Sequence, residues 1–227
     1  SILPLHFCLL RPKDIVSGDF NWVKRIDDYI YFAAIDCTGH GVPGAFMSLI
    51  ANNTLNQTVY TGTLDTGQIL TTLHQRINQT LNQDENSNRD GMDISICRWD
   101  QKNKKLTFSG ARNPLIYLNE KGVHKVKGDK CSVGGIISEK HRNYEFTTHE
   151  IDVNSPTMFY VFSDGYQDQF SSDTNKKFTL KRMLSLFEKH SHLSMNEQHE
   201  LYSSEFDKWK GDTDQIDDIL LMGVKLE

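Results

Sequence analysis

Residues 29–47 read YIYFAAIDCTGHGVPGAFM, in which an apolar run is followed by one acid and a glycine-rich turn. The aromatic and β-branched residues of the run predict a buried strand. Pro43 lies where the first turn of a helix tolerates a missing N–H. Asp36 stands between the predicted strand and the turn. A carboxylate beside a loop with so few side chains can hold a metal ion or a phosphate close to the backbone.

The composition limits the class of protein. A chain of 227 residues suffices for one large domain or two small ones, and its apolar share of 37% allows a buried core. The net charge of −5 argues against a general nucleic-acid binder, which needs a basic face. The sequence has no apolar run of membrane-spanning length and no visible signal peptide. We therefore expect no nucleic-acid partner and no membrane contact by this domain.

The first residue is Ser rather than Met, so we expect the chain to be part of a longer regulatory protein. The cysteines Cys8, Cys37, Cys97 and Cys131 lie far apart without Cys-x-x-Cys spacing, which disfavours a structural zinc site. Scattered buried thiols in a reducing cytoplasm are the expectation, and the predicted location is cytoplasmic. A nucleophilic role for Cys37 is the alternative, although nothing nearby in the sequence is arranged as its base.

The hydrophobic patterns predict strands, then two helices, then many strands, two helices and a closing strand. The first strands are predicted at 2–10, 20–24 and 29–35, and the first helices at 43–60 and, after a break at 62–67, over Ile69 to Leu81. A polar loop at 82–89 leads to strands at 92–99, 105–109, 115–118, 122–127, 144–153 and 158–162. The last elements are helices around Leu180–Phe187 and Leu201–Trp209 and a strand at 219–224.

This order of elements predicts an α+β fold. Residues 1–227 contain no Pro- or Ser-rich linker and no internal repeat, so we expect a single domain. The strands are too many for one sheet that must also cover itself. We therefore predict a β-sandwich of two antiparallel sheets flanked by helix pairs, in α-β-β-α layers.

Acids stand at one end of four apolar strands. Asp36 and Asp164 follow their strands, whereas Asp19 and the pair Asp217-Asp218 precede theirs. In an antiparallel sheet the start of one strand lies beside the end of its neighbour, so these acids can meet at one edge. Crowded carboxylates must take up protons unless cations neutralise them, and oxygen ligands suit Mg²⁺ or Mn²⁺. The alternative is that each acid is only a turn former.

Two further features of the glycine-rich turn have alternative interpretations. Residues 39–44 match G-x-G-x-x-G, but a dinucleotide site requires a parallel strand after the helix, and here a second helix and a polar loop follow. His40 suits proton donation near neutral pH, and the alternative is a solvent-exposed loop histidine.

Several motifs resemble, in order, those of the bacterial SpoIIE-like serine phosphatases, which belong to the PPM (type 2C) metal-dependent phosphatases. The resemblance spans nearly the whole chain and rests on Val16-Ser17-Gly18-Asp19-Phe20, on residues 36–45, on Phe162-Ser163-Asp164-Gly165 and on Asp217-Asp218-Ile219-Leu220. Asp90-Gly91-Met92-Asp93 and Ser109-Gly110-Ala111-Arg112-Asn113-Pro114 are also similar to this group.

The resemblance implies two Mn²⁺ or Mg²⁺ ions at one end of the sandwich. Asp36 would bridge the ions, Cys37 would contribute its backbone carbonyl, and the other metal-ligand candidates are Asp19, Asp164, Asp217 and Asp218. Asp217 is favoured over Asp218, although the doublet leaves a one-residue ambiguity. The candidates for catalysis are Asp36, Asp164 and His40.

Two departures from the family pattern concern the phosphate. The arginine that grips phosphate in the eukaryotic branch has no clear counterpart, and Arg11 and Lys13 are candidates. The loop after Asp36 is longer than in that branch, so His40 is not equated with its general acid.

The function that the resemblance implies is that of a metal-dependent protein serine/threonine phosphatase. A metal-bridging hydroxide would attack phosphoserine or phosphothreonine directly on a regulatory protein, such as an anti-sigma-factor antagonist. Homodimerisation through upstream or helical regulatory segments is a further expectation. The alternative function is a catalytically silent signalling or binding module with the same fold.

Overall fold

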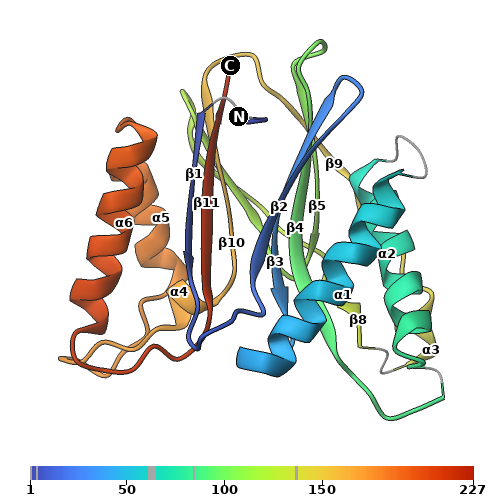
Figure 1. The fold of residues 1–227 in the computed structure, drawn as a ribbon. Coiled ribbons are helices and arrows are strands. Elements are labelled where there is room, and N and C mark those ends of the chain that lie inside the picture. Colours follow the sequence, from blue (N-terminus) through green and yellow to red (C-terminus); the bar gives the residue numbers. More distant parts are fainter. Residues whose placement is uncertain (1, 4, 61–64, 84, 136–137) are drawn as a thin grey trace.

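Two antiparallel sheets pack face to face and are covered on both outer sides by helices (Figure 1), in the computed structural model of the protein. The structure describes residues 2–3, 5–60, 65–83, 85–135 and 138–227. The first sheet has the order β1 (Leu5–Arg11), β11 (Ile219–Leu226), β10 (Thr157–Phe162), β6 (Leu115–Asn119) and β7 (Gly122–Val126). The second has the order β2 (Phe20–Ile26), β3 (Tyr29–Cys37), β4 (Gly91–Asp100), β5 (Lys105–Ala111) and β9 (His149–Asp152), and β8 (Val133–Gly134) pairs with β4.

Strand β3 shows why the sheets stack in this way, because its residues are apolar on both faces. The odd-numbered residues from Tyr31 to Ile35 pack against the helices of the same side. The even-numbered residues from Ile30 to Ala34 pack between the sheets, against residues of β10 and β11 such as Phe159. Successive side chains of a strand point to opposite faces, so a strand buried on both faces needs a layer on each side.

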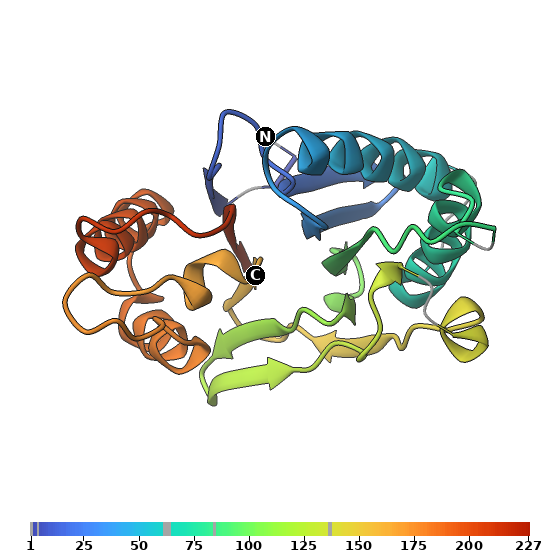
Figure 2. The same ribbon diagram turned by 90° about the horizontal axis from the view of Figure 1, so that it is seen from below.

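The helices form the two outer layers (Figure 2). Helices α1 (Gly41–Tyr60) and α2 (Thr66–Thr80) cover the second sheet, whereas α5 (Leu180–His190) and α6 (Met195–Lys210) cover the first. Two short helices complete the fold, α3 (Glu139–Arg142) and α4 (Gly165–Asp168). The start of α1, the connection from β1 to β2, and α4 lie at one end of the sandwich, and both termini lie at the other (Figure 1).

The predicted α+β sandwich with outer helix pairs is confirmed, and one strand prediction was wrong. Of residues 144–153, only His149–Asp152 forms a strand, because the preceding segment crosses α2 and uses side-chain partners. Phe146 N–H donates to Thr71 Oγ1 at 3.0 Å, and Thr147 N–H donates to Asp129 Oδ2 at 2.8 Å. Part of the predicted break at 62–67 lies outside the described residues. Elements β8, α3 and α4 were not predicted, since each has only two to four residues.

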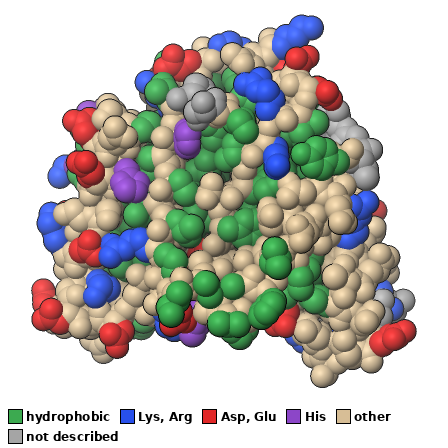
Figure 3. Space-filling model, viewed as in Figure 1, with side chains coloured by type: hydrophobic (Ala, Val, Ile, Leu, Met, Phe, Trp, Pro, Cys, Tyr) green, Lys and Arg blue, Asp and Glu red, His purple; other side chains and the backbone are tan. Residues whose placement is uncertain are grey.

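The outer surface includes exposed apolar residues. Hydrophobic side chains gather on the face seen in Figure 3, and the exposed ones in the molecule include Ile15, Val42, Phe46 and Leu49. Within the described part of the chain, no helix is both long and apolar enough to cross a membrane.

Candidate active site

The predicted acids come together at one end of the sandwich. The β2–β3 hairpin pairs Phe20 with Ile35, which makes Asp19 and Asp36 neighbours in one sheet. Strand β10 pairs antiparallel with β11, which brings Asp164 and Asp217 together in the other sheet. The two pairs face each other because Asp36 continues the row of β3 residues that points at the first sheet.

Asp36 differs slightly from its predicted place after the strand. Strand β3 continues through Cys37, and Asp36 lies within it, opposite Asp93 of β4. The strand is longer than predicted because its last residues still pair with β4. The carboxylate of Asp36 is therefore held by a sheet and not by a loop.

A polar pocket of about 410 Å³ lies among these acids. Asp36, Asp164 and Asp217 line it together with His40 and Cys37, while Asp19 is buried at 5% exposure. The structure thus gathers residues that are up to 181 positions apart in the chain, from Asp36 to Asp217. Residues of this kind around a cavity are candidates for a functional site.

Burial and mutual repulsion make the carboxylates hard to ionise without a cation. Burial, followed by the charges of Asp19 and Asp164, raises the pKa of Asp36 to about 9. Burial also raises the pKa of Asp19 to about 7, helped by the charges of Asp218 and Asp217. Asp164 is exposed at the pocket, and its pKa is raised less, to about 6, by partial desolvation and by Asp217. Positive charge in the pocket would stabilise the ionised forms.

The donor set fits divalent cations. Asp19 Oδ2 is buried and has no hydrogen-bond partner among the described residues, so it retains a lone pair for a ligand. The described residues contain no group of three or more His, Cys, Asp or Glu side chains already arranged around one point as metal ligands. The carboxylates therefore surround the pocket without forming a closed coordination shell. Oxygen donors of this kind are the ligands that Mg²⁺ and Mn²⁺ prefer.

The two residues of the acidic doublet have different surroundings. Asp217 is half-buried and lines the pocket. Asp218 is buried at 2% exposure, and both of its oxygens accept backbone N–H groups, from Lys13 and from Gly18, each at 2.7 Å. Asp218 thus holds the connection from β1 to β2, which leads into Asp19.

The remaining sequence candidates lie in different places. His40 lines the pocket and is about half exposed, so its two interpretations are both compatible with its position. Cys37 is buried, and burial with the charge of Asp36 raises the pKa of its thiol well above the usual value, which disfavours a nucleophilic thiolate. Arg11 pairs with Asp207 of α6 at 2.8 Å and lies over the ring of Phe206. Lys13 lies beside His40.

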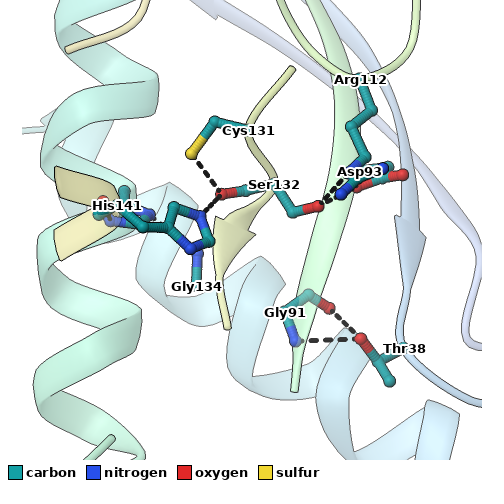
Figure 4. Close-up of polar contacts among 9 residues, drawn as sticks. Thr38, Gly91, Asp93, Arg112, Cys131, Ser132, Gly134 and His141 are labelled. Carbon is teal, nitrogen blue, oxygen red and sulfur yellow. Dashed lines mark hydrogen bonds and ion pairs between the residues drawn. The ribbon is translucent and has the colours of Figure 1, made fainter. Parts of the chain in front are cut away.

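Sequence reasoning missed a polar group on the side of the pocket formed by β4 and β5 (Figure 4). Arg112 directly follows β5 and donates from Nε to Ser132 Oγ at 2.8 Å, and Ser132 Oγ donates to Asp93 Oδ1 at 2.6 Å. Arg112 has φ of +59°, a conformation that non-glycine residues rarely adopt. Asp93, Arg112 and Ser132 all line the pocket, as does Arg89. Asp93 and Arg112 stand in sequence motifs noted above, but Ser132 gives no local signal.

The turn after Asp36 is tied to the same strand. Thr38 Oγ1 donates to the carbonyl of Gly91 at 3.1 Å and accepts the N–H of Gly91 at 3.0 Å (Figure 4). The strand after the helices, β4, runs antiparallel to β3. This pairing contradicts the dinucleotide-binding unit, which requires a parallel strand at that point.

The helix-covered β-sandwich places the chain in the structural class of PP2C-type phosphatase domains, because solved structures of such domains share this fold. The SiaA-PP2C domain of Pseudomonas aeruginosa is 26% identical with a TM-score of 0.88, over 98% of this chain and 86% of that one. The PP2C domain with a regulatory fragment of the cell fate determinant SpoIIE from Bacillus subtilis is 17% identical with a TM-score of 0.75, over 98% and 63%. RsbX in complex with magnesium is 15% identical with a TM-score of 0.68, over 98% and 94%.

The sequence identifies the family within this class. Residues 26–227 match the family model described as Stage II sporulation protein E (SpoIIE), and the chain belongs to this family. A search of curated proteins found no match.

Proposed function

We propose that the chain is a divalent-cation-dependent protein phosphatase that hydrolyses phosphoserine or phosphothreonine on a regulatory protein. The observation that carries the proposal is the cluster of Asp19, Asp36, Asp164 and Asp217, which lies at one end of the sandwich in a chain of the SpoIIE family. Such a cluster is costly to the metal-free protein, since several buried carboxylates repel one another. Buried carboxylates that repel one another beside a pocket are typical of a functional site.

The pocket residues have separate roles in this proposal. Asp19, Asp36, Asp164, Asp217 and the carbonyl of Cys37 would hold two Mn²⁺ or Mg²⁺ ions, which when bound would activate water and polarise the phosphate. Asp218 would support this set through the backbone of Lys13 and Gly18. Arg112 is held by Ser132 and would bind phosphate oxygens, because a guanidinium offers a planar pair of donors.

The substrate and the setting of the domain are parts of the same proposal. Similarity to a domain of a cell fate determinant supports a signalling phosphoprotein as substrate, such as an anti-sigma-factor antagonist. Residues 1–227 would act as one phosphatase domain in the cytoplasm. A homodimer formed through upstream or helical segments would be one way to regulate it.

Hydrolysis of p-nitrophenyl phosphate and of a phosphoserine peptide tests the proposal. The purified chain is assayed with Mn²⁺, with Mg²⁺ and with chelator, beside Asp164→Asn and the control Glu150→Gln on β9. We expect metal-dependent turnover that Asp164→Asn reduces at least about 100-fold and the control leaves unchanged. Mn²⁺ binding without turnover of either substrate would favour a silent binding module, and metal-independent turnover would contradict the proposed site.

A further inference from the structure

A groove of about 610 Å³ lies between helices α5 and α6, which cover the outer face of the first sheet (Figure 2). It is larger than the acid-lined pocket of about 410 Å³. The apolar part of the groove consists of Phe178, Leu186 and Trp209, of which Phe178 is buried and the other two are half-buried. Cavities of this size with an apolar lining and a few polar groups are typical of ligand sites.

The charged residues of the groove are mainly basic, in a chain whose net charge is −5. Lys181 and Arg182 stand in the first turn of α5, and Lys208 stands on α6. Lys208 pairs with Glu205, the acid that lines the groove, at 2.9 Å. Lys181 and Arg182 have no carboxylate partner among the residues that the structure describes. Their two positive charges are therefore not compensated within the groove.

The start of α5 adds to this positive charge. A helix begins at the positive end of its dipole, so acids are preferred in the first turn and a side chain usually caps the first N–H groups. Helix α5 has no acid in its first turn, and Thr179 at the N-cap makes no capping hydrogen bond through its side chain. The dipole and the two basic residues repel one another in the free protein. A bound carboxylate would relieve this repulsion.

Arg182 lies over an aromatic ring instead of pairing with an acid. Its guanidinium carbon is 4.3 Å from the centroid of the Trp209 ring. The indole N–H of Trp209 donates to the carbonyl of Gln169 at 3.0 Å, which holds the ring in place at the groove. A guanidinium stacked on a ring keeps its in-plane N–H groups available for a carboxylate. Arg182 is exposed, so a ligand from solvent can reach it.

The length of the groove limits the size of its ligand. Along α5 the groove extends from Thr179 to Leu186, which is about 10 Å at the rise of an α-helix. An extended chain of about three or four residues has this length. A nucleic acid would require a wider basic face than these two residues, and the acidic remainder of the chain would repel it.

We propose that this groove binds a short acidic segment of a partner protein. An apolar side chain of the segment packs against Leu186 and Trp209, and its carboxylates pair with Lys181 and Arg182. The charges of the segment thus complement the uncompensated charges of the groove. Binding there needs neither a metal ion nor hydrolysis, so it is independent of the proposed phosphatase activity.

Fluorescence anisotropy with a labelled peptide, in the presence of chelator, tests the proposal. The probe is the peptide Glu-Asp-Leu-Glu-Phe-Asp, and the control peptide Gln-Asn-Leu-Gln-Phe-Asn has nearly the same shape without the charges. We expect a dissociation constant below about 100 μM for the acidic peptide and binding at least about 10-fold weaker for the neutral one. Binding of the acidic peptide should weaken as the salt concentration rises, since exposed charges are screened.

Variants of α5 test the two kinds of contact. Arg182→Glu should raise the dissociation constant of the acidic peptide at least about 10-fold. An acid in the first turn suits the helix dipole, so this variant should keep or raise the melting temperature. Lys189→Glu reverses an exposed charge in the last turn of the same helix, outside the groove, and is the matched control that should leave binding unchanged. Leu186→Ala should weaken binding about 5-fold through the lost apolar contact.

The tryptophans report where the peptide binds. The chain has three of them, and Trp22 and Trp99 are buried at 4% and 3% exposure, outside the groove. In nitrogen-15 NMR spectra of the wild type, the acidic peptide should shift the indole N–H signal of Trp209. The signals of Trp22 and Trp99 should stay in place.

Several results would contradict the proposal. Equal binding of the two peptides, an equal loss in Lys189→Glu and Arg182→Glu, or an unshifted Trp209 signal would overturn it. Absence of binding by the acidic peptide at about 1 mM would do the same. Self-association of the purified chain that Arg182→Glu abolishes would assign the groove to a second copy of the chain instead.

Discussion

The carboxylate of Asp218 accepts the backbone N–H of Gly18 at 2.7 Å, although the two residues are 200 positions apart. Its other oxygen accepts the N–H of Lys13 at the same distance. One buried side chain thus joins the start of β11 to the connection that leads into Asp19. The neighbouring Asp217, in contrast, faces the pocket. We therefore predict different effects for the two acids of the doublet, on stability for Asp218 and on metal binding for Asp217.

Asp218→Asn should destabilise the fold, and Asp217→Asn should weaken metal binding. An amide at position 218 places an NH₂ group against a backbone N–H, which should cost about 2 kcal/mol in the free energy of unfolding. Asp217 is half-buried, and its amide can still accept the N–H of Asp218, so we expect less than about 0.5 kcal/mol there. Urea unfolding without metal and calorimetry with Mn²⁺ measure the two effects.

The two variants serve as controls for each other, since each removes one charge from the same end of the sandwich. Unchanged Mn²⁺ affinity in Asp217→Asn, together with lost affinity in a folded Asp218→Asn, would contradict this assignment.

The metal-free protein should become less stable as the pH rises from about 4 to about 9. The pKa values of Asp164, Asp19 and Asp36 are raised from 3.8 to about 6, 7 and 9. The folded state therefore binds more protons than the unfolded state across this window, and the free energy of unfolding must fall as these protons leave. Urea unfolding at several pH values in the presence of chelator measures the slope.

Divalent cations should reverse this trend, because they bind the ionised carboxylates and displace the protons. We expect Mn²⁺ to raise the melting temperature more at pH 8 than at pH 6. Asp36→Asn, which removes the group with the largest shift, should flatten the slope of the metal-free protein. A stability that rises with pH in chelator would show that these carboxylates are not protonated in the folded state.

The sequence predicted the parts of the molecule whose signal is local. Apolar strands such as β3 predict the sandwich. The acids at the strand ends predict where Asp36 and Asp164 meet, because antiparallel pairing brings strand starts and ends together. Ser132 could not be found in this way, since it lies just before the two-residue strand β8 and is positioned by contacts with Asp93 and Arg112, which are distant in the sequence. The contact of Asp14 Oδ2 with His40 Nδ1, at 2.7 Å, likewise depends on two loops that meet only in the folded chain.

Gly44→Ala should distort the turn that carries His40. A Cβ at Gly44 would lie 2.2 Å from the carbonyl oxygen of Gly39, and the neighbouring atoms are backbone that cannot move aside. We expect a loss of about 3 kcal/mol in the free energy of unfolding, as for other overpacked sites. Val42→Ala, in the same helical turn but 63% exposed, is the control and should change stability by less than about 0.5 kcal/mol. Wild-type stability in Gly44→Ala would show that the close approach of Gly39 to Gly44 is not maintained in solution.

Arg112→Ala should weaken phosphate binding without unfolding the chain. Arg112 is largely exposed and lines the pocket, where its Nε donates to Ser132 Oγ. The left-handed backbone at this position costs alanine and arginine a similar conformational free energy. The substitution therefore tests the guanidinium and not the turn. We expect KM for a phosphoserine peptide and the inhibition constant of inorganic phosphate to rise about 10-fold, with a smaller change in kcat. Arg112→Lys should recover only part of the affinity, because an ammonium lacks the planar pair of donors.

Arg25→Ala, which removes an exposed arginine on β2, takes away the same charge elsewhere and should leave both constants unchanged. Inhibition by phosphate that is equal in Arg112→Ala and the wild type would exclude Arg112 as the phosphate-binding residue.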